Sequence, residues 1–238
     1  MNDLKFSYEP DDGPAPRAGL GLIVLKTDET MEPELRALLP EDGVALYHTR
    51  IESAPEVTAE TLAQMADKMV EAASLLPEAA NLKVIAYGCT SGATVIGENR
   101  VEQLIKSVHP RVLVTNPLTA LKAKLDDLGA RRIALLTPYV PEVTDALREA
   151  LNDAGFEVVA TGSFSEKREE AVTRIPPQTT LSAIEDLAGT CDCDAVFASC
   201  TNLRTVPILA EAERRTGKPV ISSNSALSWH IMRLAGLS

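Results

Sequence analysis

The sequence predicts an α/β protein of two pseudo-symmetric lobes, each a mainly parallel sheet flanked by helices, with a cleft between them. Two observations carry this prediction. Short apolar runs alternate with longer segments of helical period, as in parallel α/β proteins, and the second half of the chain repeats the first in order. The composition agrees, because 45% hydrophobic and 24% charged residues over a length of 238 are typical of a globular protein.

Eight short runs are predicted as strands. They are mostly continuous in apolar character rather than alternating, which is typical of a parallel sheet covered on both faces. In chain order they are residues 20–25, 44–47, 83–87, 111–115, 133–136, 157–161, 195–198 and 219–222.

Three of the intervening segments have a clear helical period. Residues 56–76 carry apolar side chains at spacings of three to five, and residues 99–108 place four on one face. Residues 141–154 open with a proline suited to the first helical turn and end at Gly155.

The internal repeat consists of four strand-plus-loop units at nearly constant separation. LIVLKT (22–27) matches RIALLT (132–137), and 44–47 matches 158–161; VIAYGCT (84–90) matches AVFASCT (195–201), and VLVTN (112–116) matches VISSN (220–224). Ligands of open α/β sheets bind beyond the carboxyl ends of the strands, so the repeated loops are expected to converge in one cleft. We therefore predict an N-terminal extension (1–18), a first lobe (19–128) and a second lobe (129–238), whose C-terminal segment is a candidate to pack back on the first.

The net charge and the N-terminal residues exclude several classes of binding partner. A net charge of −11 opposes binding to nucleic acid or to anionic lipid, and it gives no overall attraction for an anionic substrate, which must rely on local donors. Residues 1–19 carry acids and prolines without the pattern of a signal peptide, and no apolar run is long enough to span a bilayer. We expect a cytoplasmic protein with reduced cysteines, and a homo-oligomer.

Cys89 and Cys200 occupy equivalent places in the repeat. Each follows a buried strand and precedes a threonine at the expected start of a helix, so both thiols are predicted to enter the cleft from opposite sides. A helix N-terminus lowers the pKa of a thiol, which would leave one thiolate beside one thiol at neutral pH. Such a pair suits proton transfer across a carbon, or attack on a double bond with protonation from the far side. The alternative is two buried cysteines acting as small apolar residues.

The remaining motifs argue against a cofactor. Cys191 and Cys193 lack two further ligands at suitable spacing, so no metal is expected. Gly19-Leu20-Gly21 lacks the third glycine of a dinucleotide fingerprint, and there is no phosphate-binding loop of the GxxxxGK[ST] type.

Polar residues beside the cysteines supply donors for a substrate carboxylate. Thr90, Ser91, Thr201 and Asn202 flank the two thiols, and each could instead serve only as a helix cap. Tyr139 follows a repeated strand. Its phenol either donates a hydrogen bond into the cleft or only packs against the core.

Four segments carry a resemblance to a known family: TDETME at 27–32, YGCTS at 87–91, LTPY at 136–139 and SCTNLR at 199–204. With the duplication, they resemble the aspartate/glutamate racemase superfamily, and within it the maleate cis-trans isomerases and arylmalonate decarboxylases. The resemblance covers nearly the whole chain from Gly19 onward. It implies two pseudo-symmetric lobes with the active site between them and neither metal nor organic cofactor.

The resemblance also implies roles for individual residues. In maleate isomerases the first-lobe cysteine attacks the double bond and the second-lobe cysteine acts as acid/base; the matching residues are Cys89 and Cys200. Arylmalonate decarboxylases keep only the second cysteine, so the presence of both favours isomerase or racemase chemistry. The expected substrate-binding residues are Asp28, Thr90, Ser91, Tyr139, Ser165, Thr201 and Asn202.

Two of these positions depart from the family pattern. Asp28 stands where the family usually has an asparagine that contacts a substrate carboxylate, and a second family asparagine falls near Ser165. A carboxylate at 28 repels a dicarboxylate unless one of the two is protonated. The TDET variant looks most like the ectoine-utilisation branch, whose substrate would carry a cation that Asp28 could pair with.

The leading hypothesis is thus a cofactor-independent isomerase or racemase of a small carboxylate. The alternatives are a decarboxylase that uses Cys200 alone, a non-catalytic protein that binds small carboxylates, and a redox-sensing thiol protein, which requires the two sulfurs to be close enough for a disulfide.

Overall fold

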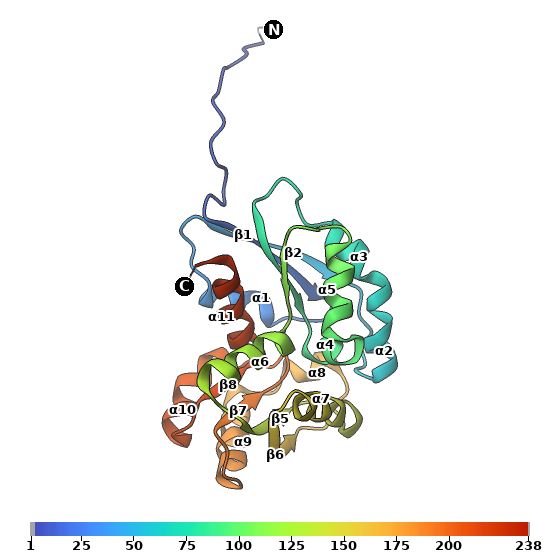
Figure 1. Ribbon diagram of the computed structural model, residues 1–238, viewed down its shortest axis with the longest axis vertical. Helices are drawn as coiled ribbons and strands as arrows, with labels where there is room; N and C mark the ends of the chain where they lie inside the picture. Colours follow the sequence, from blue (N-terminus) through green and yellow to red (C-terminus); the bar gives the residue numbers. More distant parts are fainter. Residues whose placement is uncertain (1–2, 238) are drawn as a thin grey trace.

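The computed structural model describes residues 3–237 and contains two four-stranded parallel sheets (Figure 1). The first sheet has the order β2-β1-β3-β4 and the second the order β6-β5-β7-β8, so each strand has a counterpart four strands later in the chain. The predicted α/β fold with two pseudo-symmetric lobes is confirmed. The strands are β1 (Ala18–Leu25), β2 (Val44–Ile51), β3 (Leu82–Gly88), β4 (Leu113–Thr115), β5 (Arg132–Thr137), β6 (Glu157–Ser163), β7 (Ala195–Ala198) and β8 (Val220–Ser222).

The inner strands explain the continuous apolar runs. Every residue of β1 and of β7 is buried, because helices cover both faces of each sheet. The edge strands β2 and β6 are less buried, with half-buried and exposed residues along most of their length. One apolar cluster contains Leu22 of β1 together with Ile133 of β5 and Phe197 of β7, so the two lobes share a core.

Eleven α-helices lie within the described part of the chain. They are α1 (Met31–Leu38), α2 (Ala59–Gln64), α3 (Ala66–Ser74), α4 (Thr90–Ile96), α5 (Glu98–Lys106), α6 (Pro117–Leu128), α7 (Pro141–Asp153), α8 (Glu169–Val172), α9 (Pro177–Gly189), α10 (Leu209–Thr216) and α11 (Ser223–Ala235). The predicted helices at 99–108 and 141–154 correspond to α5 and α7, and Gly155 follows α7 with a φ of 86°.

The single helix predicted at 56–76 is wrong in detail. The segment forms α2 and α3, which are separated at Met65, where the backbone makes a tight turn with its N–H bonded to Leu62 O. Residues 56 and 57 are not helical, because they pair with Arg168 and Lys167 of the second lobe. The apolar period detects the buried face but not this competing pairing.

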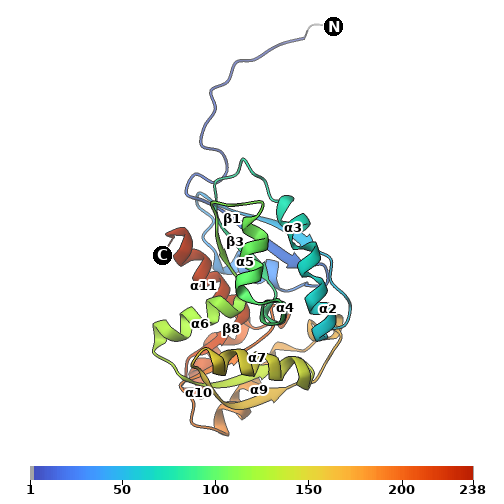
Figure 2. The same cartoon turned by 45° about the vertical axis from the view of Figure 1, so that its right-hand side comes forward.

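Helices α6 and α11 begin at equivalent strand ends and pack against each other (Figure 2). α11, at the C-terminal end of the chain, contacts β1, β3 and β4 of the first sheet. Residues of α6 line a surface hollow together with Val220 and Ile221 of β8. The lobe limits at 1–18, 19–128 and 129–238 stay a prediction.

The described chain from residue 3 to about residue 12 extends away from the two lobes in both views (Figures 1 and 2). Its apolar side chains Leu4, Phe6 and Tyr8 are exposed. Among the described residues, no helix has the length and apolar character needed to cross a membrane.

Candidate active site

The two cysteines lie at the carboxyl ends of the corresponding strands β3 and β7. Cys89 directly follows β3 and is the residue at which α4 begins, with an extended backbone. Cys200 follows β7 by two residues. Their exposed fractions are 3% and 4%, so both thiols are inside the molecule.

The Cys89 thiol is held against the first turn of α4. Its sulfur accepts a hydrogen bond from the Gly92 N–H at 3.2 Å and lies 3.6 Å from the Ser91 hydroxyl. A Cβ added at Gly92 would lie 3.0 Å from this sulfur and would clash with the Tyr87 hydroxyl. Glycine at position 92 therefore permits the close approach of sulfur to helix.

The loop after β7 is joined to the Cys89 loop by hydrogen bonds. The Cys200 N–H donates to the Ser223 hydroxyl at 3.0 Å, and that oxygen lies 2.7 Å from the Thr90 hydroxyl. Thr201 donates from Oγ1 to the Gly88 carbonyl at 3.4 Å. Cys200 itself has a φ of 109°, a backbone conformation that residues other than glycine rarely adopt.

Burial of both thiols favours their neutral form. Burial raises the pKa of Cys89 to about 12, against the lowering effect of the Ser91 hydroxyl and the Gly92 N–H. Burial, followed by the charge of Glu169, raises the pKa of Cys200 well above its usual value. Desolvation thus opposes the effect of the helix N-terminus on the thiol pKa, and the pairing of one thiolate with one thiol stays a prediction.

Tyr139 is buried beside both thiols. Burial raises the pKa of its phenol well above the ordinary value, and the charges of Cys200 and Cys89 raise it further. Its carbonyl accepts hydrogen bonds from the hydroxyls of Thr144, at 3.3 Å, and of Ser163. The phenol is thus buried near both thiols, and whether it contacts the substrate or only packs in the core stays a prediction.

Asp28 lies 2% exposed at the start of α1. Its Oδ1 accepts hydrogen bonds from the amides of Thr30 and Met31, both at 2.8 Å. Its Oδ2 is buried without a hydrogen-bond partner among the described residues. Burial raises the pKa of this carboxyl.

Asn202 connects the Asp28 loop to the second lobe. Its Oδ1 accepts from the Glu29 N–H at 3.0 Å, and its carbonyl accepts from the Thr30 hydroxyl at 3.0 Å. Its Nδ2 donates to both the carbonyl and the Oε2 of Glu169, each at 3.2 Å. The side chain of Asn202 thus uses its hydrogen bonds to connect the loop after Asp28 with Glu169.

The structure does not bring Ser165 to this cluster. Ser165 is exposed at a turn with a φ of 52°, and its N–H donates to the Ser163 hydroxyl. The buried residue from this segment is Glu169, whose N–H donates to the Pro55 carbonyl at 3.1 Å. The sequence gives no signal for Glu169, because the run 166–170 is charged throughout and resembles a solvated loop.

Glu169 is a buried carboxyl whose pKa is raised towards neutrality. Burial, followed by the charge of Asp28, raises its pKa to about 7, against the lowering effect of Asn202. Its charge in turn raises the pKa values of Cys89, Cys200 and Tyr139. The two thiols, the phenol and two carboxyls therefore form one electrostatically coupled cluster.

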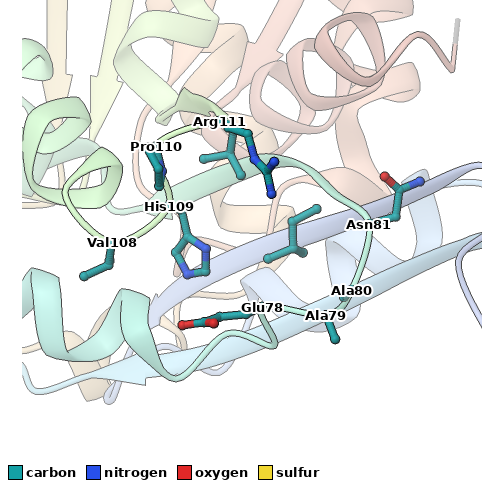
Figure 3. A pocket seen from close by; sticks show the side chains of 10 residues that line it. Glu78, Ala79, Ala80, Asn81, Val108, His109, Pro110 and Arg111 are labelled. Carbon is teal, nitrogen blue, oxygen red and sulfur yellow. The ribbon is translucent and has the colours of Figure 1, made fainter.

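A hollow of about 640 Å³ lies at the opposite end of the first sheet (Figure 3). Residues 78–82 and 108–112 line it, at the amino ends of β3 and β4, and it contains neither cysteine. Ligands of parallel sheets bind at the carboxyl ends. The buried cysteine cluster, closed in this structure, is thus the better candidate for the active site.

Among residues 3–237, no group of three or more His, Cys, Asp or Glu side chains could hold a metal ion. Two of the three histidines make structural contacts. His230 lies 2.8 Å from the Thr115 hydroxyl, and His109 lies 2.9 Å from the Ala73 carbonyl.

A sequence model of the arylmalonate decarboxylase family matches residues 20–238. The chain belongs to this family. Among curated relatives, the maleate isomerase of Nocardia farcinica is 28% identical over 90% of this chain and 88% of its own length. The arylmalonate decarboxylase of Bordetella bronchiseptica is 33% identical over 51% of each chain.

Solved structures of family members confirm the fold. The Nocardia farcinica maleate cis-trans isomerase, in a cysteine-to-serine mutant with a covalently bound succinylcysteine intermediate, is 27% identical and has a TM-score of 0.80 over 92% of this chain and 93% of its own. The predicted resemblance and the prediction of an isomerase-type enzyme are confirmed at the level of this family, which also contains decarboxylases.

Proposed function

We propose that this protein is a cofactor-independent isomerase of a small carboxylate, with Cys89 and Cys200 acting on opposite sides of the reacting carbon. The observation that carries the proposal is the hydrogen-bond connection from Thr90 through Ser223 to the Cys200 amide. This connection joins the two cysteine loops across the lobes, so that two thiols from separate halves of the chain serve one site.

The neighbouring donors suit a carboxylate. Hydroxyls of Thr90, Ser91 and Thr201 lie on the two loops, all buried. Buried neutral donors bind a carboxylate at lower desolvation cost than an unpaired cation would incur. We infer that Tyr139, which is coupled to both thiols, orients the substrate or shields the reacting carbon from water.

Isomerisation by two thiols conserves atoms and charge. In one direction, a thiolate removes the proton next to the substrate carboxylate, and the opposite thiol returns a proton to the other face. For a double bond, the Cys89 thiolate adds to one carbon while the electron pair of the double bond moves to the neighbouring carbon, which takes a proton from Cys200. The resulting single bond rotates, Cys200 removes the proton again, and the electron pair re-forms the double bond as the Cys89 thiolate leaves. Both routes need one thiolate, which this buried site disfavours until a ligand alters its charge.

Relatives support the proposal. A maleate isomerase in the family carries a covalently bound succinylcysteine intermediate, which is the kind of adduct that sulfur addition produces. The cytoplasmic location, the homo-oligomeric state and the ectoine-utilisation branch remain expectations from the sequence.

The test separates isomerase from decarboxylase. Turnover and CO₂ release are measured for wild type, Cys89→Ala and Cys200→Ala over a panel of maleate, amino acids and arylmalonates. The proposal expects that each substitution abolishes isomerisation while the fold is retained. CO₂ release that survives Cys89→Ala and needs Cys200 would instead establish the decarboxylase, and binding without any reaction would favour the non-catalytic protein.

A further inference from the structure

We propose that Tyr87 is a positioning residue for Cys89, and that its phenol O–H turns from the Met65 sulfur to the Cys89 sulfur when the Cys89 thiol loses its proton. This donor supplies part of the stabilisation that a Cys89 thiolate needs inside the protein. The inference rests on the proposed function, because it concerns how one of the two thiols is activated.

The side chains of Tyr87 and Cys89 point to the same face of the first sheet. Tyr87 lies in β3, and Cys89 directly follows that strand with an extended backbone. Residues two positions apart in an extended chain share one face. Both side chains are buried, so the strand places a phenol and a thiol close together in the core.

The Tyr87 hydroxyl and two sulfurs meet at the first turn of α4. A Cβ added at Gly92 would collide with the Tyr87 hydroxyl, and it would lie 2.9 Å from the Met65 methyl carbon and 3.0 Å from the Cys89 sulfur. Met65, at the junction of α2 and α3, accepts the Tyr87 O–H on its sulfur at 3.5 Å. The three groups therefore surround one small space beside Gly92.

The present acceptor of the Tyr87 O–H is a weak one. A thioether sulfur accepts hydrogen bonds poorly, whereas hydrogen bonds to an ionised group are roughly twice as strong as those between neutral groups. A hydroxyl hydrogen rotates to suit its partner, so the phenol can change acceptors while its ring stays in place. A negative charge on the Cys89 sulfur therefore attracts a donor that Met65 holds only weakly.

Tyr87 acts as a donor and does not compete for the negative charge. Burial, followed by the charge of Cys89, raises the pKa of the Tyr87 phenol well above its ordinary value, so the phenol keeps its proton. The hydroxyls of Ser91 and Tyr87 and the N–H of Gly92 each lower the pKa of Cys89, against the effect of burial. The thiol proton itself leaves to solvent as pH rises.

The charged groups around Cys89 do not take over this role. Glu169, from the second lobe, raises the pKa of Cys89. The helices that pack against α4 are α2, α5, α6 and α7. Their charged side chains are exposed or form ion pairs, such as Glu98 with Lys122 and Asp145 with Arg148. Stabilisation of a Cys89 thiolate thus depends on neutral donors, of which Tyr87 is one.

The experiment measures the fraction of thiolate at Cys89 without using turnover. The protein is treated with iodoacetamide at several pH values above neutrality, and alkylation of Cys89 and of Cys200 is followed separately by peptide mass spectrometry. Because only the thiolate reacts, the rate at a fixed pH reports its population. The ratio of the Cys89 rate to the Cys200 rate corrects for access of the reagent to the buried cluster.

Tyr87→Phe keeps the ring and removes only the hydroxyl. We expect the Cys89-to-Cys200 rate ratio to fall by about 10-fold or more, as for the loss of one hydrogen bond to a charged group. With a reacting substrate, the rise of kcat/KM with pH should move to higher pH. Tyr47→Phe removes a hydroxyl from half-buried β2 and is the matched control, which should change neither.

Met65→Leu is a second variant, which removes the competing acceptor at nearly constant volume. It should keep or raise the Cys89-to-Cys200 ratio, because the Tyr87 O–H then has no other sulfur to bind. A fall in the ratio for Met65→Leu would contradict the proposal even if Tyr87→Phe folds poorly.

An unchanged ratio in a folded Tyr87→Phe protein overturns the inference, and so does an equal fall at both cysteines, which would mean altered access. These outcomes are separable from the proposed function. A lowered ratio in Tyr87→Phe, together with full turnover in Cys89→Ala, supports the inference and contradicts the two-thiol reaction. Loss of turnover in both cysteine variants, with an unchanged ratio in Tyr87→Phe, does the reverse.

Discussion

At the scale of single residues, Cys200 shows how the site holds a reactive group in place. A φ of 109° is costly for any side chain other than glycine, typically by about 1–3 kcal/mol. The cost is tolerated because the Cys200 amide is fixed by Ser223 and the next two residues are tied to Gly88 and Glu169. Strain at a buried thiol in a hydrogen-bonded loop is typical of functional positions.

This strain predicts a difference between two variants at position 200. Cys200→Gly and Cys200→Ala both remove the thiol and should both be inactive, but only glycine relieves the backbone. We expect the glycine variant to be more stable than the alanine variant by about 1 kcal/mol in urea unfolding. Equal stabilities would contradict the argument from φ.

Ser223 is predicted to stabilise the loop that carries Cys200. Ser223→Ala leaves the buried Cys200 amide without its acceptor and should lower the free energy of unfolding by about 1–3 kcal/mol, with slower turnover. Ser228 is also buried on α11, but its hydroxyl has no partner in the described chain. Ser228→Ala is therefore the matched control and should cost little, and a similar loss in both variants would show that the hydrogen bond is unimportant.

At the scale of elements, the first turn of α4 shapes the Cys89 environment. Cys89 directly follows β3, and the N–H of Gly92, three residues later in the first turn of α4, donates a hydrogen bond to the Cys89 sulfur. The arrangement requires a residue without a side chain at 92, because Tyr87, Met65 and Cys89 occupy the adjacent space.

Gly92→Ala should consequently disturb both packing and reaction. We expect a loss of stability of about 1–3 kcal/mol from overpacking, and a marked fall in turnover. Gly189→Ala, at the end of α9 where a Cβ meets nothing within 4 Å, should be neutral or slightly stabilising. Thermal unfolding and rate measurements on both variants check this, and an active, stable Gly92→Ala would contradict the geometry.

At the scale of the whole molecule, the sequence predicts the structure best in the segments that belong to the internal repeat. The positions of the strands, the equivalence of Cys89 and Cys200, and their place after the buried strands β3 and β7 follow from matching units and apolar runs. Glu169 could not be found in this way, because its burial depends on pairing between residues 55–57 and 167–169, which are far apart in the chain. The rise in the thiol pKa values could not be predicted for a related reason, since desolvation depends on the packing of both lobes rather than on the local helix.

The burial of acidic side chains between the two lobes also predicts that the stability of the protein depends on pH. Folding raises the pKa of Glu169 from 4.5 to about 7, so its contribution to stability is present below about pH 4.5 and is lost as pH rises to 7. The total is on the order of 3 kcal/mol. The groups facing Glu169 are Asp28, Asn202, Tyr139 and the two thiols.

Urea unfolding between pH 5 and 8 measures this effect, since Glu169→Gln removes the titrating group and should flatten the fall in stability. Asp28 and Glu34 also have raised pKa values, so part of the slope should remain. Glu170→Gln should keep the full slope. An unchanged slope in Glu169→Gln would mean that Glu169 is ionised at no unusual cost.

The most direct test of the central claim is α-proton exchange or double-bond isomerisation followed by NMR in D₂O, with a reacting member of the ligand panel. Wild type is compared with Cys89→Ala, Cys200→Ala and Cys193→Ala, the last being a buried cysteine outside the cluster. The account predicts that the first two variants are folded and inactive and that Cys193→Ala keeps its rate. Full activity in a folded Cys89→Ala or Cys200→Ala protein would contradict the two-thiol site.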